Sequence, residues 1–315
     1  MSKIQLGISS CLMGQKVRFD TGHKLDRYVT KTLNAYFEYL PFCPEMAIGL
    51  GTPRPAIRLQ QQADKQIRAV MLKTDQDHTD ALRKYADSVL PKLANISGYI
   101  LKSKSPSCGM ERVKVYDTKG MPVYETSPGI YAGRLQEALP NVPFEEEGRL
   151  NDPLLRENFI KRVFVYHDWQ TLNCAGLTVN ALIQFHTRHK MLLILHHYGH
   201  SKTLGRLVAG ADHTNVQGIA EEYIALFMQT LQRLPSRRHH GQVLTRIVGT
   251  INQQLSHAQK HDILAMIGEY TQGQLPLSVP VRLIKHYLTG IDDAFIKQQS
   301  YLSPYPDELG LMAKL

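Results

Sequence analysis

The sequence predicts an α/β domain followed by an all-α domain. In the first half, short apolar runs alternate with helical patterns, which is typical of a Rossmann-like domain with a mostly parallel sheet. In the second half the hydrophobic period is almost wholly helical, and the connections are short. The composition changes at the same place, because of fourteen histidines only His23 and His78 precede residue 150. We therefore expect two domains, at residues 1–150 and 151–315.

Strands and helices are expected to alternate through the first domain. A strand at 4–9 is followed by a loop and then by a helix at 26–40, whose apolar residues fall near one stripe. A short extended segment between Pro41 and Pro44 ends at Phe42 and Cys43. The remaining elements are strands at 68–72, 96–101 and 113–116, and helices at 79–93 and 128–139.

The segment FEEEGRLNDPLLREN is predicted to connect the two domains. Asp152 is a helix-capping residue, and Pro153 suits the first turn of the helix that follows. We expect Arg237, Arg238, His239 and His240 to form a basic cluster on a loop. The predicted helices of the second domain lie at 153–168, 178–197, 201–209, 214–234, 241–254, 257–272 and 279–287.

The composition is that of an ordinary soluble globular protein, with 43% apolar and 21% charged residues. No apolar run is long enough to span a membrane, and the N-terminal residues do not resemble a secretory signal, so we expect a cytoplasmic protein with reduced thiols. The net charge of +9 favours a polyanionic partner. Nothing in the sequence indicates an obligate protein partner.

Three cysteines follow predicted strands. Cys11 comes after the first strand, Cys43 ends the second, and Cys108 lies in a loop after a later one. The loops at the carboxyl ends of parallel strands converge on one crevice, so three thiolates could meet there and bind a soft metal. An iron–sulfur cluster held by three cysteines would keep one iron open as a Lewis acid. The alternative is three small buried residues that never meet, since no CxxC pair is present.

Polar residues beside these cysteines are candidates for catalysis and substrate binding. Glu45 lies two residues after Cys43, on the same side of an extended segment, where it could transfer protons. It could equally be a solvated or capping residue. Ser105 and Ser107 could bond the substrate or be plain loop serines. The basic residues of the same loops, which could hold phosphate or carbonyl groups or simply be solvated, are Arg18, Arg54, Lys102 and Lys104.

The motif FHTRHK places His186, His189 and Lys190 on one side of a predicted helix. A basic, histidine-bearing face could contact an RNA backbone. It could also be a solvated face, and a zinc site there would lack a cysteine or carboxylate at fitting spacing.

Several motifs resemble a known family. ISSCLMG, FCPE and KSKSPSCG are similar to motifs of the bacterial thiouracil desulfidase family, in the same order and over about residues 1–150. The second half, with LIQFHTRHKMLLILHHYGHSKTLGRLVA and LPLSVPVRLIKHYL, resembles the helical domain fused to it in bacterial enzymes that remove sulfur from 4-thiouridine in tRNA.

The resemblance implies a [4Fe-4S] cluster bound by Cys11, Cys43 and Cys108, with its fourth iron open to the substrate sulfur. It also implies acid/base roles for Glu45 and Ser105. The expected reaction turns the thiocarbonyl of a thiolated uridine in tRNA into a carbonyl and releases sulfide, with no net electron transfer. Cys174 matches none of these motifs, and we expect it to be a buried structural residue.

Two other functions stay open. Three cysteines and a glutamate also suit a zinc hydrolase or deaminase acting on a nucleobase, although the usual deaminase signature is missing. An RNA-binding protein whose cluster senses redox state would share the metal and the RNA affinity without turnover.

Overall fold

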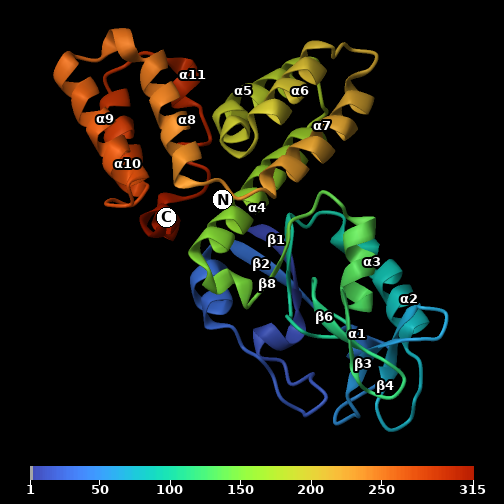
Figure 1. Cartoon of the computed structure of the whole chain (residues 1–315). Coiled ribbons are helices and arrows are strands. Elements are labelled where there is room, and N and C mark those ends of the chain that lie inside the picture. The colour runs from blue at the N-terminus through green and yellow to red at the C-terminus, as the bar shows by residue number, and fades with distance from the viewer. Residues whose placement is uncertain (1–2) are drawn as a thin grey trace. The chain divides into compact units, whose positions relative to one another are not determined.

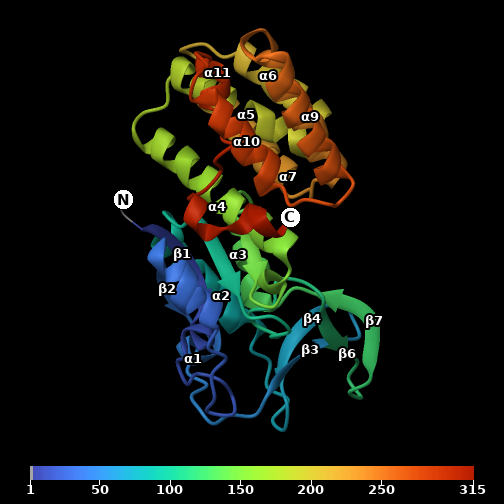
Figure 2. The ribbon, with the colours of Figure 1, turned by 90° about the vertical axis from the view of Figure 1, so that its left-hand side faces the viewer.

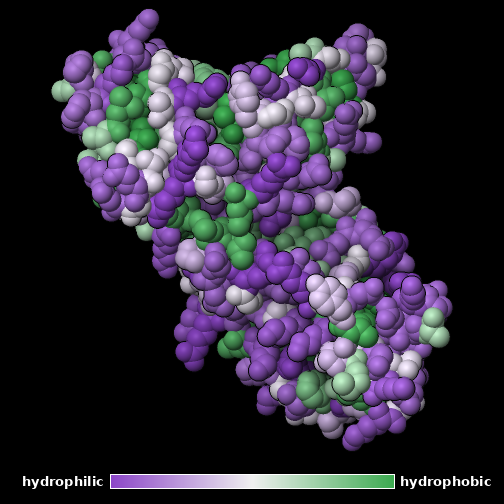
Figure 3. Space-filling model, in the orientation of Figure 1, coloured by the Kyte–Doolittle hydropathy of each residue, from purple (hydrophilic) through white to green (hydrophobic). Residues whose placement is uncertain are grey.

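The computed structural model describes residues 3–315 (Figure 1). The chain forms two compact units, the first ending at Asn151 and the second comprising Asp152–Leu315. Hydrophilic residues cover most of the face seen in Figure 3, so the apolar side chains mainly pack inside each unit. Within residues 3–315, none of the helices is long and apolar enough to cross a bilayer.

The first sheet of the first unit is parallel throughout, as predicted. Its order is β2-β1-β5-β8, formed by β2 (Phe37–Phe42), β1 (Ile4–Ser9), β5 (Gly98–Leu101) and β8 (Phe144–Glu146). Gly7 lets the strands approach closely, because a Cβ there would lie 2.3 Å from the buried Tyr99 ring. The carboxyl ends of all four strands lie along one edge, where the loops bearing the cysteines begin.

A second sheet completes the first unit and was not predicted as such. Its order is β4-β3-β6-β7, and only the β3–β6 pair is parallel. Figure 2 shows these four strands grouped apart from β1 and β2. Leu59, Ala69 and Val115 are fully buried in its core. Its strands are β3 (Ile57–Gln61), β4 (Ile67–Met71), β6 (Val113–Tyr116) and β7 (Pro122–Ser127).

The helices of the first unit are α1 (Pro44–Ala47), α2 (Thr79–Val89) and α3 (Ile130–Ala138), the last two close to prediction. The helix expected at 26–40 is wrong. Only a π-helical turn at Tyr28–Thr32 and a 3-10 turn at Leu33–Ala35 form, because residues 37–42 pair with β1 as a strand. Pro41 would also be unfavourable inside a helix.

The second unit is helical, as predicted. Asp152 caps α4 by accepting from the backbone N–H groups of Leu154 and Leu155. Arg237–His240 lie in the first turn of α8 rather than in a loop, because Ser236 caps that helix in a capping box with His239. The helices are α4 (Pro153–Cys174), α5 (Val179–His196), α6 (Tyr198–Ala209), α7 (Val216–Leu231), α8 (Arg237–Thr250), α9 (His257–Thr271), α10 (Ser278–Leu288) and α11 (Ala294–Lys297).

Candidate functional site

The three cysteines that follow strands line one cavity of about 390 Å³ in the first unit. Cys11 lies in the 3-10 turn directly after β1, and Cys43 directly precedes α1 at the end of β2. Cys108 comes from the loop after β5. Cys11 and Cys108 are buried and Cys43 is half-buried. We refer to this space as the cysteine cavity.

Burial opposes ionisation of all three thiols. It raises the pKa of Cys11 to about 11, partly offset by Arg18 and Lys102, and it raises the pKa of Cys43. Burial and the nearby Cys43 hold the pKa of Cys108 well above its usual value. Three thiolates could coexist here only with a cationic group among them, which is what a thiophilic metal centre supplies. No three His, Cys, Asp or Glu side chains within residues 3–315 are grouped so as to hold a single metal ion.

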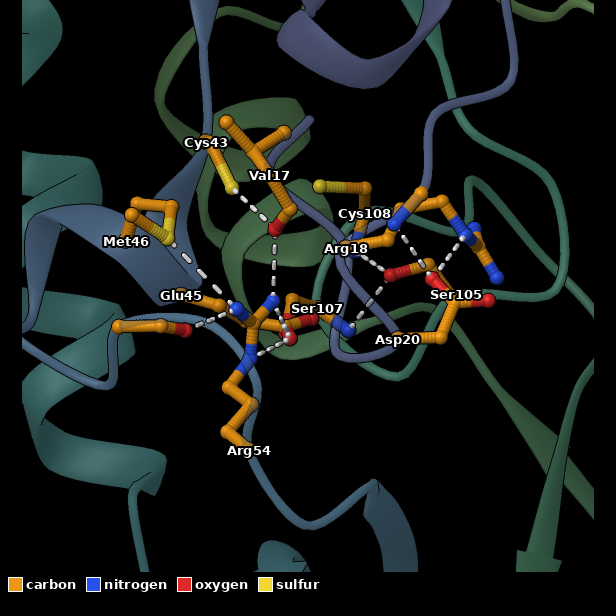
Figure 4. A network of polar contacts seen from close by, with 12 residues as sticks. Val17, Arg18, Asp20, Cys43, Glu45, Met46, Arg54, Ser105, Ser107 and Cys108 are labelled. Atoms are coloured by element: carbon orange, nitrogen blue, oxygen red, sulfur yellow. Dashed lines mark hydrogen bonds and ion pairs between the residues drawn. The ribbon is translucent and has the colours of Figure 1, made fainter. Parts of the chain in front are cut away.

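Glu45 is held in a fixed orientation beside the cysteines (Figure 4). Arg54 donates to Glu45 Oε2 from Nε at 3.0 Å and from Nη2 at 2.6 Å, while the Ser107 hydroxyl donates to Oε1 at 2.9 Å. The Arg54 and Glu45 side chains are only 3% and 15% exposed. Two charge-assisted hydrogen bonds to one carboxylate oxygen, in a largely buried ion pair, fix a carboxylate far better than a surface pair does.

Arg54 lines the cysteine cavity, but the N–H groups of its guanidinium are directed to acceptors within the protein. Its other donors bond the carbonyl oxygens of Gly51 and Val17 and contact the Met46 sulfur, so all five N–H groups have acceptors within the protein. Arg54 therefore positions Glu45 and joins the loop after β1 to α1.

The two serines of the Cys108 loop differ from each other in their surroundings. Ser105 lines the cysteine cavity, and its Oγ accepts from the backbone N–H groups of Ser107 and Cys108, at 3.3 and 3.1 Å. Ser107 is fully buried against Glu45, so it orients that carboxylate instead of binding the substrate. Ser105 gives the loop its shape while leaving its hydroxyl hydrogen for the cavity.

The remaining predicted basic residues of this site lie around the cavity. Lys102 pairs with Glu147 and bonds Ser103, so its charge is compensated. Arg18 lines the cavity, with its Nε 3.8 Å from the Asp20 carboxylate.

Sequence reasoning missed two residues that line the cavity, Phe19 and Lys24. Phe19 is 40% exposed, which is unusual for a phenylalanine. The signal was present, since both lie in the same loop as Arg18, in the segment RFDTGHK. Lys104 is exposed at the cavity, as a phosphate-binding residue would need to be.

The histidines of α5 are not on an exposed face, and this corrects our expectation. His186 bonds the Tyr223 hydroxyl at 3.2 Å, and His189 bonds the Ser300 hydroxyl at 2.6 Å. Burial lowers the pKa of His186 to about 4 and that of His189 to about 3, so both are neutral near pH 7. Lys190 alone of the three is exposed. Cys174 is exposed at the end of α4, so the expectation that it is buried is wrong too.

A basic surface does exist elsewhere in the second unit. The exposed Tyr198 ring has the Lys202 ammonium 4.7 Å and the Arg246 guanidinium 5.8 Å from its centroid. Neither cation has a carboxylate within 4.0 Å among residues 3–315. Tyr198 thereby brings two uncompensated charges from α6 and α8 together.

Comparison with known proteins divides the chain in the same way. Residues 6–147 match a family model described as 2-thiouracil desulfurase, and residues 190–306 match a family of unknown function (DUF1722). The uncharacterized protein YbgA of Escherichia coli is 28% identical over 151 residues, covering 48% of this chain and 89% of that protein. The uncharacterized protein YbbK of Bacillus subtilis is 29% identical over 153 residues, covering 47% and 98%.

One solved structure is also similar. The [4Fe-4S]-dependent thiouracil desulfidase TudS is 27% identical to this chain, with a TM-score of 0.36, and the match covers 48% of this chain and 95% of that one.

Proposed function

Residues 6–147 belong to the 2-thiouracil desulfurase family, and from this premise we propose that the chain is a [4Fe-4S]-dependent desulfidase acting on 4-thiouridine in tRNA. One observation carries the proposal. Cys11, Cys43 and Cys108, which are far apart in the sequence, line a single cavity next to a carboxylate held in place by two other side chains.

The donor set fits a cluster. These three thiols, two buried and one half-buried, all have a raised pKa and need a cationic partner to ionise, and sulfur ligands select iron–sulfur clusters or other soft metals. Cysteines that bind different irons of one cluster are also spaced more widely than ligands of one ion. When bound by three cysteines, a [4Fe-4S] cluster supplies an iron without a protein ligand, which can act as a Lewis acid toward a thiocarbonyl sulfur.

Glu45 is the general base of the proposed reaction. Its carboxylate takes a proton from the water that attacks the ring carbon, and Arg54 and Ser107 keep it aimed during that step. Ser105 is placed to donate its hydroxyl hydrogen to the tetrahedral species, because its lone pairs are already used by two backbone N–H groups. Arg54 and Ser107, which hold the Glu45 carboxylate, are buried, so they shield its hydrogen bonds from bulk water.

The pyrimidine ring stacks on Phe19, which is exposed at the cavity and whose ring centroid lies 5.6 Å from the Arg18 guanidinium. Arg18, Lys24 and Lys104 line the same cavity and offer positive charge to the sugar-phosphate backbone. A free thiolated base would use only the first of these contacts.

The positively charged surface around Tyr198 supports RNA as the partner of the helical unit. Lys202 and Arg246 have no carboxylate partner in the part of the chain that the structure describes, so a phosphate bound between them would relieve their repulsion. In this role they replace His186 and His189, which are buried.

Anaerobic reconstitution with iron and sulfide tests the proposal. The loaded chain should be brown, contain iron and acid-labile sulfide, and convert 4-thiouridine in tRNA to uridine with release of one sulfide per turnover. Cys108→Ser should lose iron, whereas Cys174→Ser, which alters an exposed cysteine outside the cavity, should retain it. A fully loaded sample that leaves thiolated tRNA and thiolated nucleosides intact would refute the proposal, and bound zinc without iron would favour a hydrolase.

A further inference from the structure

Another cavity, with a volume of about 580 Å³, lies on the second sheet of the first unit (β4-β3-β6-β7). Residues of β3 and β6 form it, together with the start of the Cys108 loop, and we call it the sheet groove. We propose that the sheet groove binds the RNA backbone next to the thiolated nucleotide. This inference rests on the proposed function and goes beyond it, since it assigns a polynucleotide-binding site outside the cysteine cavity.

The charge of the sheet groove is entirely positive. Arg58, Lys104, Arg112 and Lys114 line it, and no carboxylate does. Arg58 donates to the neutral Gln60 amide at 2.8 and 3.2 Å, so its charge is not compensated.

The other three cations are exposed, and their charge is little compensated. Lys104 and Lys114 have no carboxylate within 4.0 Å among the described residues. Arg112 is 78% exposed and lies 3.8 Å from Glu111, a weak contact. Several like charges around one groove favour a bound polyanion.

The sheet groove also offers surfaces for bases. The Arg58 guanidinium lies 6.0 Å from the centroid of the Tyr116 ring. Single-stranded bases stack on aromatic rings and on guanidinium planes. Leu72 adds an exposed apolar side chain at the same cavity. Phosphate contacts and stacking surfaces together distinguish a single-stranded RNA site from one for free phosphate.

The sheet groove lies next to the cysteine cavity. Ile57, Lys104 and Pro106 line both. Lys104, in the loop that leads to Cys108, therefore lies between the two spaces. A nucleotide whose base enters the cysteine cavity would therefore place its neighbour in the sheet groove.

A charge-matched pair of double variants of the full chain tests this. Arg112→Gln with Lys114→Gln removes two positive charges from the sheet groove, and Lys84→Gln with Lys92→Gln removes two exposed charges outside it. Binding is measured by fluorescence anisotropy of a labelled, unmodified tRNA. The groove variant should bind roughly tenfold more weakly at about 0.1 M salt, and its slope of log affinity against log salt should fall by about 1.4, at about 0.7 per single-strand phosphate contact. The control should change less than twofold.

Kinetics give the second readout. The KM for thiolated tRNA should rise about tenfold in the groove variant, and this rise should exceed any change in KM for the 4-thiouridine nucleoside by at least fivefold. Equal RNA affinity in both variants would overturn the inference, as would competition by polyglutamate as strong as that by RNA, which would indicate an acidic protein partner. The binding assay uses unmodified RNA and needs no turnover. A chain that binds RNA through the sheet groove but lacks desulfidase activity would therefore refute the proposed function and leave the inference about the groove standing.

Discussion

Acidification should destabilise the helical unit through His186. This side chain is buried, and its pKa falls from 6.5 to about 4 in the folded chain because of burial and the nearby Lys190. The unfolded chain therefore binds a proton below about pH 6.5 that the folded chain refuses until about pH 4. His186 therefore does not reduce the free energy of unfolding above about pH 6.5, and it reduces this free energy progressively as the pH falls toward 4.

The size of the effect follows from the two pKa values. At 1.36 kcal/mol per pH unit, the difference between 6.5 and about 4 corresponds to about 3 kcal/mol over the whole range. Between pH 7 and pH 5 the loss from His186 is about 2 kcal/mol. His189 and His240, whose pKa values are lowered to about 3, add to the total in the same direction.

The chain provides its own probe, since its one tryptophan lies in the helical unit. Trp169 is buried, and its ring centroid lies 5.2 Å from that of Phe185 and 5.8 Å from that of Tyr223, whose hydroxyl bonds His186. Urea unfolding followed by tryptophan fluorescence at pH 7 and pH 5 gives the free energy of unfolding of this unit. In His186→Gln the loss of stability between these pH values should be about 2 kcal/mol smaller than in the parent chain. His261→Gln, at a side chain 77% exposed, is the control and should lose as much as the parent. An equal loss in His186→Gln and the parent would refute the reasoning.

Three further predictions concern the cysteine cavity. Glu45→Gln should lower the turnover of thiolated tRNA by about 10²- to 10⁴-fold while iron content is retained, and undiminished turnover would contradict the role of Glu45 as the general base. Ser107→Ala removes a hydrogen bond to a charged group worth about 1.5–3 kcal/mol, so kcat should fall at least about tenfold; a change confined to KM would contradict a role in orienting Glu45. Gly129→Ala would place a Cβ 2.6 Å from the Ser107 carbonyl, so iron bound per chain should fall and unfolding should become about 1–3 kcal/mol easier, whereas Gly148→Ala has ample space and should match the parent on both measures.

The cysteine cavity could be anticipated because parallel strands leave few choices. Once β1, β2 and β5 are parallel neighbours, the residues that follow them must come together at one edge. The second sheet could not be anticipated in the same way. None of the six residues of β7 is buried and Tyr124 is fully exposed, so no alternation of apolar and polar residues marks the strand. Its pairing with β6 creates the strand.

Side-chain roles near the cavity were harder to assign. Ser105 and Ser107 are equivalent in sequence, and only the turn of their loop decides that Ser107 meets Glu45. For α5 the helical period correctly placed His186 and His189 on one stripe. That stripe also carries Leu182 and Phe185, which are buried, so it faces the core. When a helix face mixes polar and apolar residues, the sequence pattern shows which residues share that face but not whether the face packs against the core or points to solvent.

The hydrogen bonds of the Arg54 guanidinium have a consequence for how a metal centre would assemble in the cysteine cavity. It bonds the segment around Val17, the carboxylate that follows Cys43 and the carbonyl of Gly51, while its own backbone N–H donates to Phe19. These bonds need no iron, so two of the three sulfur-bearing loops acquire their shape from the polypeptide itself. Small zinc-dependent domains are unfolded until the ion arrives. In this chain the Arg54 hydrogen bonds join two of the cysteine loops without a metal, so we expect that a cluster can be inserted after the polypeptide has folded.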